Sequence, residues 1–249
     1  MIQETPRILV GIATVSPDKR FLESLPPFTR QVTERDIARL DFCWVWGKPL
    51  VEAQNDLAER LLEGSFTHLL TIEDDHWAFT AEMLKIALEA DSSVAAIPYR
   101  SRHFPFPMIP QRFNKLDENG VKHFREIRGA EGYQVADLCG FGFTLIQREV
   151  FSKLDRPFFR LNHQYYKGVG PHATDIDFCA RVQEAGFTIT GCFQHRLNHR
   201  DITEEEYDRM KVEGILSKHS MFTYISDMAR KKKYQQEHAG QPTPTLQGV

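Results

Sequence analysis

The sequence predicts a mixed α/β protein in which a mostly parallel central sheet is flanked by helices. Short apolar segments rich in β-branched residues, which are typical of buried parallel strands, alternate with stretches whose apolar residues recur at helical spacing. The predicted strands cover residues 7–15, 41–46, 67–72 and 93–98. Strands separated by helices of this size indicate parallel pairing through right-handed crossovers.

Three helices are predicted between these strands. The first is a broken stretch, because Pro26 and Pro27 interrupt it. The second opens at Pro49, keeps its apolar residues on one face and ends at Gly64. Thr80 is suited to cap the third helix, because its hydroxyl can accept a hydrogen bond from the first turn.

The pattern changes after residue 98. Residues 99–110 are dense in proline and aromatic residues, which predicts irregular or edge-like structure. Asn119-Gly120 predicts a turn between two strand-like pieces. The later predicted elements are a strand with a glycine-containing turn at 135–146, helices at 148–154 and 175–185, and a strand at 187–193.

We expect three parts along the chain. Residues 1–200 are predicted to form one catalytic domain. Residues 201–235 are predicted to form a C-terminal helical extension, because acidic residues open the segment at the positive end of a helix dipole. Residues 236–249 are predicted to be a disordered tail.

Composition excludes several classes of protein. The 249 residues carry a formal net charge of −3, which gives no general attraction to nucleic acid or an anionic membrane. A basic run at 230–233 leaves nucleic-acid contact open, although a solvated helix end is the commoner explanation. No apolar run approaches the roughly 20 residues of a membrane helix, so we expect no membrane span. The 4 cysteines are widely spaced without a CxxC pair, so we expect no disulfide framework and a cytoplasmic location.

Three consecutive carboxylates, Glu73, Asp74 and Asp75, directly follow the third predicted strand. Ligands of open parallel sheets bind outside the carboxyl ends of the strands, so these side chains stand where a site is expected. Carboxylate oxygens suit Mg²⁺ or Mn²⁺, and such ions commonly bridge to substrate phosphates. The alternative is a solvated acidic loop that caps the next helix.

Residues 51–79 (VEAQNDLAERLLEGSFTHLLTIEDDHWAF) resemble the GT-A glycosyltransferases, chiefly the inverting family two type, which have a Rossmann-like sheet. Those proteins have a helix with an asparagine near its start, then a strand, then Asp-x-Asp. The resemblance implies that Asp75 contacts a metal bridging the donor diphosphate, and that Glu73 lies near the donor ribose or sugar. Glu73 replaces the first aspartate of the motif, and Asp74 lies between the two acidic positions.

The same resemblance places the donor nucleotide beside the first strand and its following turn. Thr14 can offer a hydroxyl there, and Asn55 either bonds across strands or contacts the nucleotide. Residues 135–154 resemble the stretch that precedes the acceptor site of these enzymes. In it, Gly140 and Gly142 would let the backbone approach the sugar closely, unless they mark only a bend in a strand.

Residues 173–189 (ATDIDFCARVQEAGFTI) are similar to the helix that carries the catalytic base of inverting members. The resemblance places Asp175 at the position that deprotonates the acceptor hydroxyl, with Thr174 in place of the usual glutamate. Capping of the helix start is the alternative for Asp175 and Asp177, and we expect Asp177 to point elsewhere.

A late histidine often completes the metal site of GT-A enzymes, and spacing favours His199 over His195 here. A packed or surface histidine is the alternative. The loop at 163–172, before the predicted base, contains Tyr165 and Tyr166, which can stack on a sugar face.

The predicted activity is transfer of a sugar from a nucleoside diphosphate sugar to a hydroxyl acceptor. It is expected to depend on Mn²⁺ or Mg²⁺ and to invert the anomeric centre, with Asp175 as base. A nucleotidyltransferase is one alternative, but the chain has neither GxGxxG nor GxxxxGK[ST] near its first strand. The other alternative is a degenerate GT-A domain that binds without turnover.

Overall fold

The computed structural model describes residues 5–101, 107–116, 118, 122–127, 129–161, 174–200, 205 and 209. The chain divides into two compact units, Met1–Thr203 and Glu204–Val249. In the second unit, the described residues Glu205 and Arg209 are helical. The predicted helical extension and tail otherwise lie outside the described residues. The fold described below is that of the first unit.

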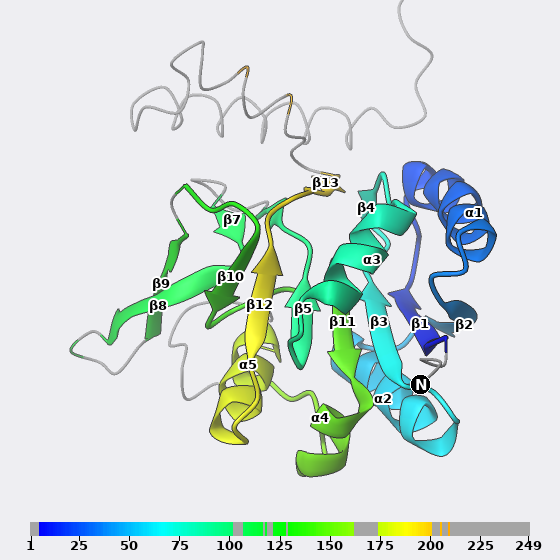
Figure 1. Cartoon of the computed structure of the whole chain (residues 1–249). Coiled ribbons are helices and arrows are strands. Elements are labelled where there is room, and N and C mark those ends of the chain that lie inside the picture. Colours follow the sequence, from blue (N-terminus) through cyan, green and yellow to red (C-terminus); the bar gives the residue numbers. More distant parts are fainter. Residues whose placement is uncertain are drawn as a thin grey trace, which may run out of the picture. The chain divides into compact units, whose positions relative to one another are not determined.

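The centre of the first unit is a seven-stranded, largely parallel sheet (Figure 1). In spatial order its strands are β10 (Tyr133–Ala136), β12 (Ile189–Cys192), β5 (Val94–Ala96), β11 (Phe143–Gln147), β3 (His68–Ile72), β1 (Arg7–Thr14) and β2 (Arg39–Trp46). β1 is parallel to β2 and β3, and β5 is parallel to β12. β11 is antiparallel between β3 and β5, and β10 is antiparallel at one edge. The predicted fold class is therefore confirmed.

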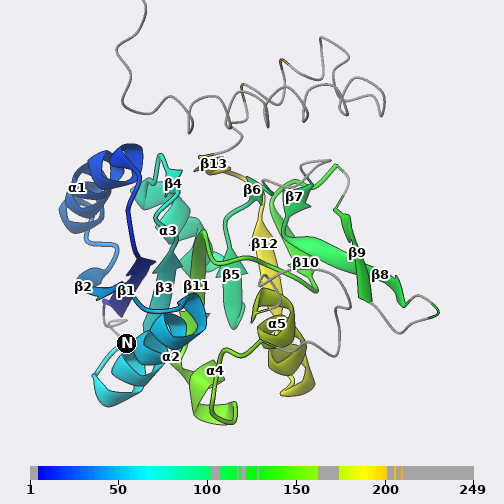
Figure 2. The same cartoon turned by 180° about the vertical axis from the view of Figure 1, so that it is seen from behind.

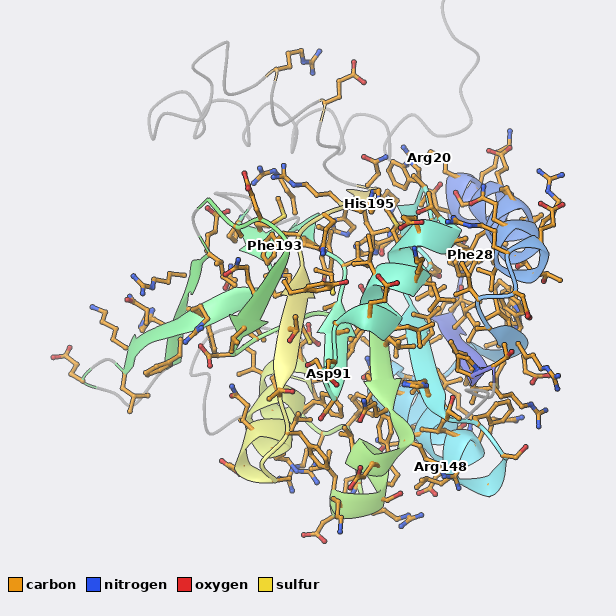
Figure 3. The ribbon with its side chains drawn as sticks, viewed as in Figure 1. Arg20, Phe28, Asp91, Arg148, Phe193 and His195 are labelled. Carbon is orange, nitrogen blue, oxygen red and sulfur yellow. The ribbon has the colours of Figure 1, made fainter. Side chains whose placement is uncertain are left out.

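Helices cover both faces of the sheet (Figure 1; Figure 2). They are α1 (Lys19–Glu34), α2 (Leu50–Glu63), α3 (Ala81–Glu89), α4 (Arg148–Lys153) and α5 (Thr174–Glu184). α1 and α3 contribute to one buried apolar cluster, whereas α2, α4 and α5 contribute to the other. In the first cluster, Phe28 lies between α1 and the sheet (Figure 3), with its ring 5.8 Å from that of Phe143. The sheet thus separates two buried apolar layers, one under each set of helices.

α1 is continuous, so the expected interruption at Pro26 and Pro27 is wrong. Its buried residues are Phe21, Leu25, Phe28 and Val32, which recur at helical spacing and form one stripe against the sheet. Proline removes a helical N–H and weakens a helix interior, but here the burial of two phenylalanines outweighs that loss.

The segment predicted as one strand with a turn, residues 135–146, belongs to two separate strands. β10 pairs with β12 at the sheet edge, whereas β11 lies between β3 and β5. The glycines therefore lie in a connection that runs from the amino end of β12, where β10 ends, to the carboxyl ends of β3 and β5, where β11 begins. Periodicity does not reveal this connection, because the apolar pattern continues through it.

Arg148 fixes the far end of α2. It lies at the end of the sheet opposite Arg20 (Figure 3) and donates hydrogen bonds to the carbonyl oxygens of Leu62 at 2.6 Å and Gly64 at 2.7 Å. These bonds satisfy carbonyls that a helix end leaves without intrahelical partners. These bonds anchor the carboxyl end of α2. The first residue of the helix, Leu50, lies at its other end and lines the cavity described below.

Three two-stranded ladders accompany the main sheet. They pair β4 (His76–Trp77) with β13 (Asn198–His199), β6 (Tyr99–Arg100) with β7 (Met108–Ile109), and β8 (Gln111–Leu116) with β9 (Lys122–Glu126). β8 and β9 are the two strand-like pieces expected around Asn119-Gly120, a turn that lies outside the described residues. Among the described residues, no helix is long and apolar enough to cross a membrane.

Candidate functional site

A cavity of about 440 Å³ opens at the carboxyl ends of β1 and β3. The acidic triplet, the start of α5, the end of β13 and the connection before β11 all contribute to it. Its lining residues include Ala13, Leu50, Glu73, Asp74, Asp75, Tyr99, Ser101, Cys139, Gly140, Thr174, Asp175, His199 and Arg200. Segments distant in sequence therefore meet at the edge of the sheet where ligands of α/β folds bind.

The backbone of the acidic triplet is fixed by hydrogen bonds from several elements. The N–H of Asp18 donates to the carbonyl of Asp74 at 2.9 Å, and the N–H of Arg200 donates to the carbonyl of Asp75 at 2.9 Å. The N–H of Glu73 donates to the carbonyl of Gly142 at 3.4 Å. Because each residue of the triplet has a main-chain hydrogen bond to another element, the backbone that carries the three carboxylates is fixed before any ligand arrives.

Asp75 lies between two histidines that the β4–β13 ladder brings together. Residues His76 and His199 are register partners in that ladder, and their rings stack at 4.5 Å. Asp75 places one oxygen 3.0 Å from Nδ1 of His76 and the other 3.3 Å from Nε2 of His199. One ligand atom from each of the three residues lies within 4.8 Å of the others, so the group is able to hold a metal ion.

The ring of His199 is oriented by the main chain. Its Nδ1 is 3.1 Å from the carbonyl oxygen of Arg100, so we assign the proton to Nδ1, which donates to that carbonyl. In neutral His199 the Nε2 lone pair then faces a carboxylate oxygen of Asp75 at 3.3 Å. Two electron-pair donors at this distance require a cation, either a proton or a metal ion. Backbone anchoring of the second ring nitrogen is typical of metal-binding histidines.

The carboxylates of the triplet differ in their readiness to ionise. Burial raises the pKa of Asp75, but hydrogen bonds from His199 and His76, present when a proton lies between each ring and the carboxylate, lower it further, so the net pKa is well below the usual range. Burial raises the pKa of Asp74, and the hydrogen bond that Thr14 donates to it opposes this only in part. The histidines therefore favour the ionised form of Asp75, whereas burial disfavours the ionised form of Asp74.

The start of α5 brings Asp175 to the same cavity. The hydroxyl of Thr174, which is buried, donates to Oδ1 of Asp175 at 3.0 Å and orients the carboxylate. Asp177 is instead buried beside Arg160, whose guanidinium lies 2.9 Å from its carboxylate. The expectation that Asp177 points elsewhere is confirmed.

A smaller cavity of about 360 Å³ adjoins the first. The two share Ala13, Leu50, Asp74 and Arg200 as lining residues. The smaller cavity also has Thr14, Val15, Ser16 and Lys48 in its wall. Thr14 and Asp74, two of the expected donor-binding residues, thus lie together at this smaller cavity.

Two expected residues are used for packing contacts instead of lining the cavity. The side-chain amide of Asn55 donates to the carbonyl of Phe159 at 2.7 Å and accepts from its N–H at 3.1 Å, and Asn55 lines neither cavity. Gly142 also lies outside both linings, and a Cβ there would meet His76 at 2.8 Å. Only Gly140 of the two glycines lines the cavity. Tyr165 and Tyr166 lie outside the described residues.

Gly140→Ala is expected to destabilise the fold, by about 1–3 kcal/mol. A Cβ at Gly140 would stand 1.8 Å from the hydroxyl oxygen of Tyr99, which is buried beneath the cavity. Urea unfolding measures the change. Tyr99→Phe in the same chain removes that oxygen and is expected to recover part of the loss. Equal stability of Gly140→Ala and the wild type would contradict the close packing.

Sequence reasoning missed three residues of the site. His76 directly follows the triplet, and its proximity to two acids was a usable signal. Arg200 follows His199 in the same way. Tyr99 directly follows the predicted strand 93–98, so its place at a carboxyl end of the sheet was likewise a usable signal. His195, the less favoured histidine, is absent from the lining of the larger cavity among the residues that the structure describes.

No protein-family model matches the chain, and no curated protein matches it. Among solved structures, it is similar to the protein A197 from STIV, with 14% identity, a TM-score of 0.49, and coverage of 78% of this chain and 85% of that one. It is also similar to a structure described as a glucose-1-phosphate thymidylyltransferase from Bacillus anthracis in complex with a sucrose. That match has 10% identity, a TM-score of 0.41, and coverage of 82% of this chain and 93% of that one. Both TM-scores are below 0.5, so neither similarity supports an inference about what this chain binds or catalyses.

Proposed function

We propose that this chain is a metal-dependent glycosyltransferase that moves a sugar from a nucleoside diphosphate sugar to a hydroxyl acceptor. The observation that carries the proposal is the single cavity lined by Asp75, His199 and Asp175. These residues lie up to 124 positions apart in sequence. Their meeting at one cavity is what the GT-A resemblance requires and what an ordinary acidic surface loop does not produce.

The donor atoms fit a divalent cation. Asp75 and His199 line the cavity and would hold the ion, while His76, with no exposed surface, supports both of them from beneath. A mixed set of carboxylate oxygen and imidazole nitrogen favours Mn²⁺ over Mg²⁺, which takes oxygen ligands almost exclusively. When bound, such an ion supplies Lewis-acid stabilisation of the departing diphosphate oxygens.

Asp175 is the proposed general base. Its carboxylate accepts the proton of the acceptor hydroxyl as that oxygen attacks the anomeric carbon, while the bond from this carbon to the diphosphate oxygen breaks. The hydrogen bond from Thr174 orients the carboxylate of Asp175 at the cavity wall. A single base acting opposite the leaving group gives inversion of the anomeric centre.

The two adjoining cavities suggest how the donor is arranged. We assign the smaller one, with Thr14 and Asp74 in its wall, to the nucleoside, and the larger one, with Asp175, to the sugar and acceptor. Glu73 lines only the larger cavity, which agrees with a place near the sugar.

A thermal-shift panel of UDP, GDP, CDP, ADP and dTDP and of the corresponding triphosphates, each with and without Mn²⁺, tests the proposal. A ligand that binds only the folded chain at 100 times its Kd stabilises it by about 2.7 kcal/mol. We expect one or more of these nucleotides to raise the melting temperature only when Mn²⁺ is present. The matching diphosphate sugar should then release nucleoside diphosphate with Mn²⁺. Stabilisation by triphosphates but not by diphosphates would favour a nucleotidyltransferase, and no shift with any nucleotide would overturn the proposal.

A further inference from the structure

Arg200 stands at the boundary between the two cavities and belongs to the walls of both. Among the residues that the structure describes, it is the only arginine or lysine that lines the larger cavity. The smaller cavity has one other such residue, Lys48, whose ammonium is 2.5 Å from the carboxylate of Asp56. Arg200 is therefore the cation best placed to act between the nucleoside and sugar compartments.

The charge of the larger cavity makes a cation at this boundary necessary for an anionic ligand. Its wall carries four carboxylates, from Glu73, Asp74, Asp75 and Asp175. A diphosphate entering this field is repelled unless positive charge faces it at short range. A divalent ion on Asp75 and His199 would neutralise one side of the diphosphate, and Arg200 is positioned to face another.

The position of Arg200 is set by the same ladder that forms the proposed metal site. It directly follows β13, and its N–H donates to the carbonyl of Asp75 at 2.9 Å. Its guanidinium is 3.9 Å from Oδ2 of Asp75, which is an ion pair but too long for a hydrogen bond. The side chain is 43% exposed and forms part of both cavity walls, so a ligand in either cavity can reach it.

We propose that Arg200 binds the diphosphate of the donor at the boundary between the two cavities. The proposal rests on the proposed function for the identity of the ligand, but its chemistry is that of any diphosphate anion. A guanidinium presents planar paired donors that match phosphate oxygens, which a lysine at the same place does not. Arg200 thus complements the cation held by Asp75 without being a ligand of it.

Calorimetry with two separate probes, Mn²⁺ alone and inorganic pyrophosphate in the presence of Mn²⁺, tests this. Arg200→Gln is expected to weaken pyrophosphate binding by about 10- to 100-fold. It is expected to leave Mn²⁺ binding unchanged or to tighten it, because a positive charge is removed from beside Asp75. Arg200→Lys should give intermediate pyrophosphate affinity. Arg39→Gln, which removes an exposed charge at the amino end of β2, should change neither affinity.

Loss of pyrophosphate binding without loss of Mn²⁺ binding would distinguish a phosphate-binding role of Arg200 from general damage to the site. Parallel loss of Mn²⁺ and pyrophosphate binding in Arg200→Gln would overturn the proposal, because Arg200 would then support the metal site alone. Pyrophosphate affinity within about twofold of the wild type would also overturn it. If the wild type binds pyrophosphate with Mn²⁺ but transfers no sugar, Arg200 keeps its role and glycosyl transfer is wrong. If it transfers sugar while Arg200→Gln binds pyrophosphate normally, only the role of Arg200 is wrong.

Discussion

Asp175→Asn is expected to slow sugar transfer by about 10²- to 10⁴-fold, the usual contribution of a general base. Asparagine keeps the size of the side chain and can still accept the hydrogen bond from Thr174. It cannot take the proton of the attacking hydroxyl, so the loss should appear in the rate of transfer. Donor affinity should stay within about threefold of the wild type, because the carboxylate acts on the acceptor. The measurements are nucleoside diphosphate release with acceptor present and donor binding by calorimetry.

The matched control for this variant is Glu184→Gln. Glu184 is the last residue of α5 and is exposed, so the change removes a carboxylate from the same helix but from the end away from the cavity. We expect transfer and donor binding to be unaffected. If Asp175→Asn transfers sugar at the rate of this control, Asp175 is not the base. If it instead loses donor binding, its carboxylate belongs to the donor site.

The central strands could be predicted from the sequence because their signal is local. Residues 7–15 and 67–72 are apolar, β-branched runs, and they appear as β1 and β3 with ends moved by a single residue. The unbroken course of α1 could not be predicted, because the stabilisation comes from packing against the sheet. Intrinsic helix propensity includes the unfavourable effect of the two prolines but not the stabilisation from burying Phe21 and Phe28.

The site was predictable in parts. The acidic triplet follows a recognisable strand, so its place at the sheet edge follows from local pattern. The approach of His199 to Asp75 depends on β4 and β13, which are two residues long and too short for any periodic signal. The resemblance to GT-A enzymes suggested His199 as a metal ligand, but it did not predict the β4–β13 ladder that brings His199 to Asp75. Resemblance also suggested Asn55, whose amide the structure uses to hold the backbone of Phe159.

Asp75→Asn is expected to weaken Mn²⁺ binding by at least about 100-fold, the loss that follows when a charged ligand of a small donor set is neutralised. The change keeps the shape of the side chain but removes the negative charge that His199 and His76 face at 3.3 and 3.0 Å. The Mn²⁺-dependent thermal shift with nucleoside diphosphates should disappear with it. Titration calorimetry with Mn²⁺ alone measures the first effect, and the nucleotide panel measures the second.

Glu73→Gln is the matched control, because it neutralises a carboxylate of the same cavity two residues away. Glu73 does not belong to the group able to hold a metal ion, so Mn²⁺ affinity should stay within about threefold of the wild type. Because Glu73 is proposed to lie near the sugar, Glu73→Gln is expected to weaken binding of the diphosphate sugar more than binding of the diphosphate. If Mn²⁺ binding were instead lost in Glu73→Gln and kept in Asp75→Asn, Glu73 and not Asp75 would be the carboxylate ligand of the metal. That result would also remove the ion from beside Arg200 and leave the pairing of Asp75 with two histidines as a purely structural contact.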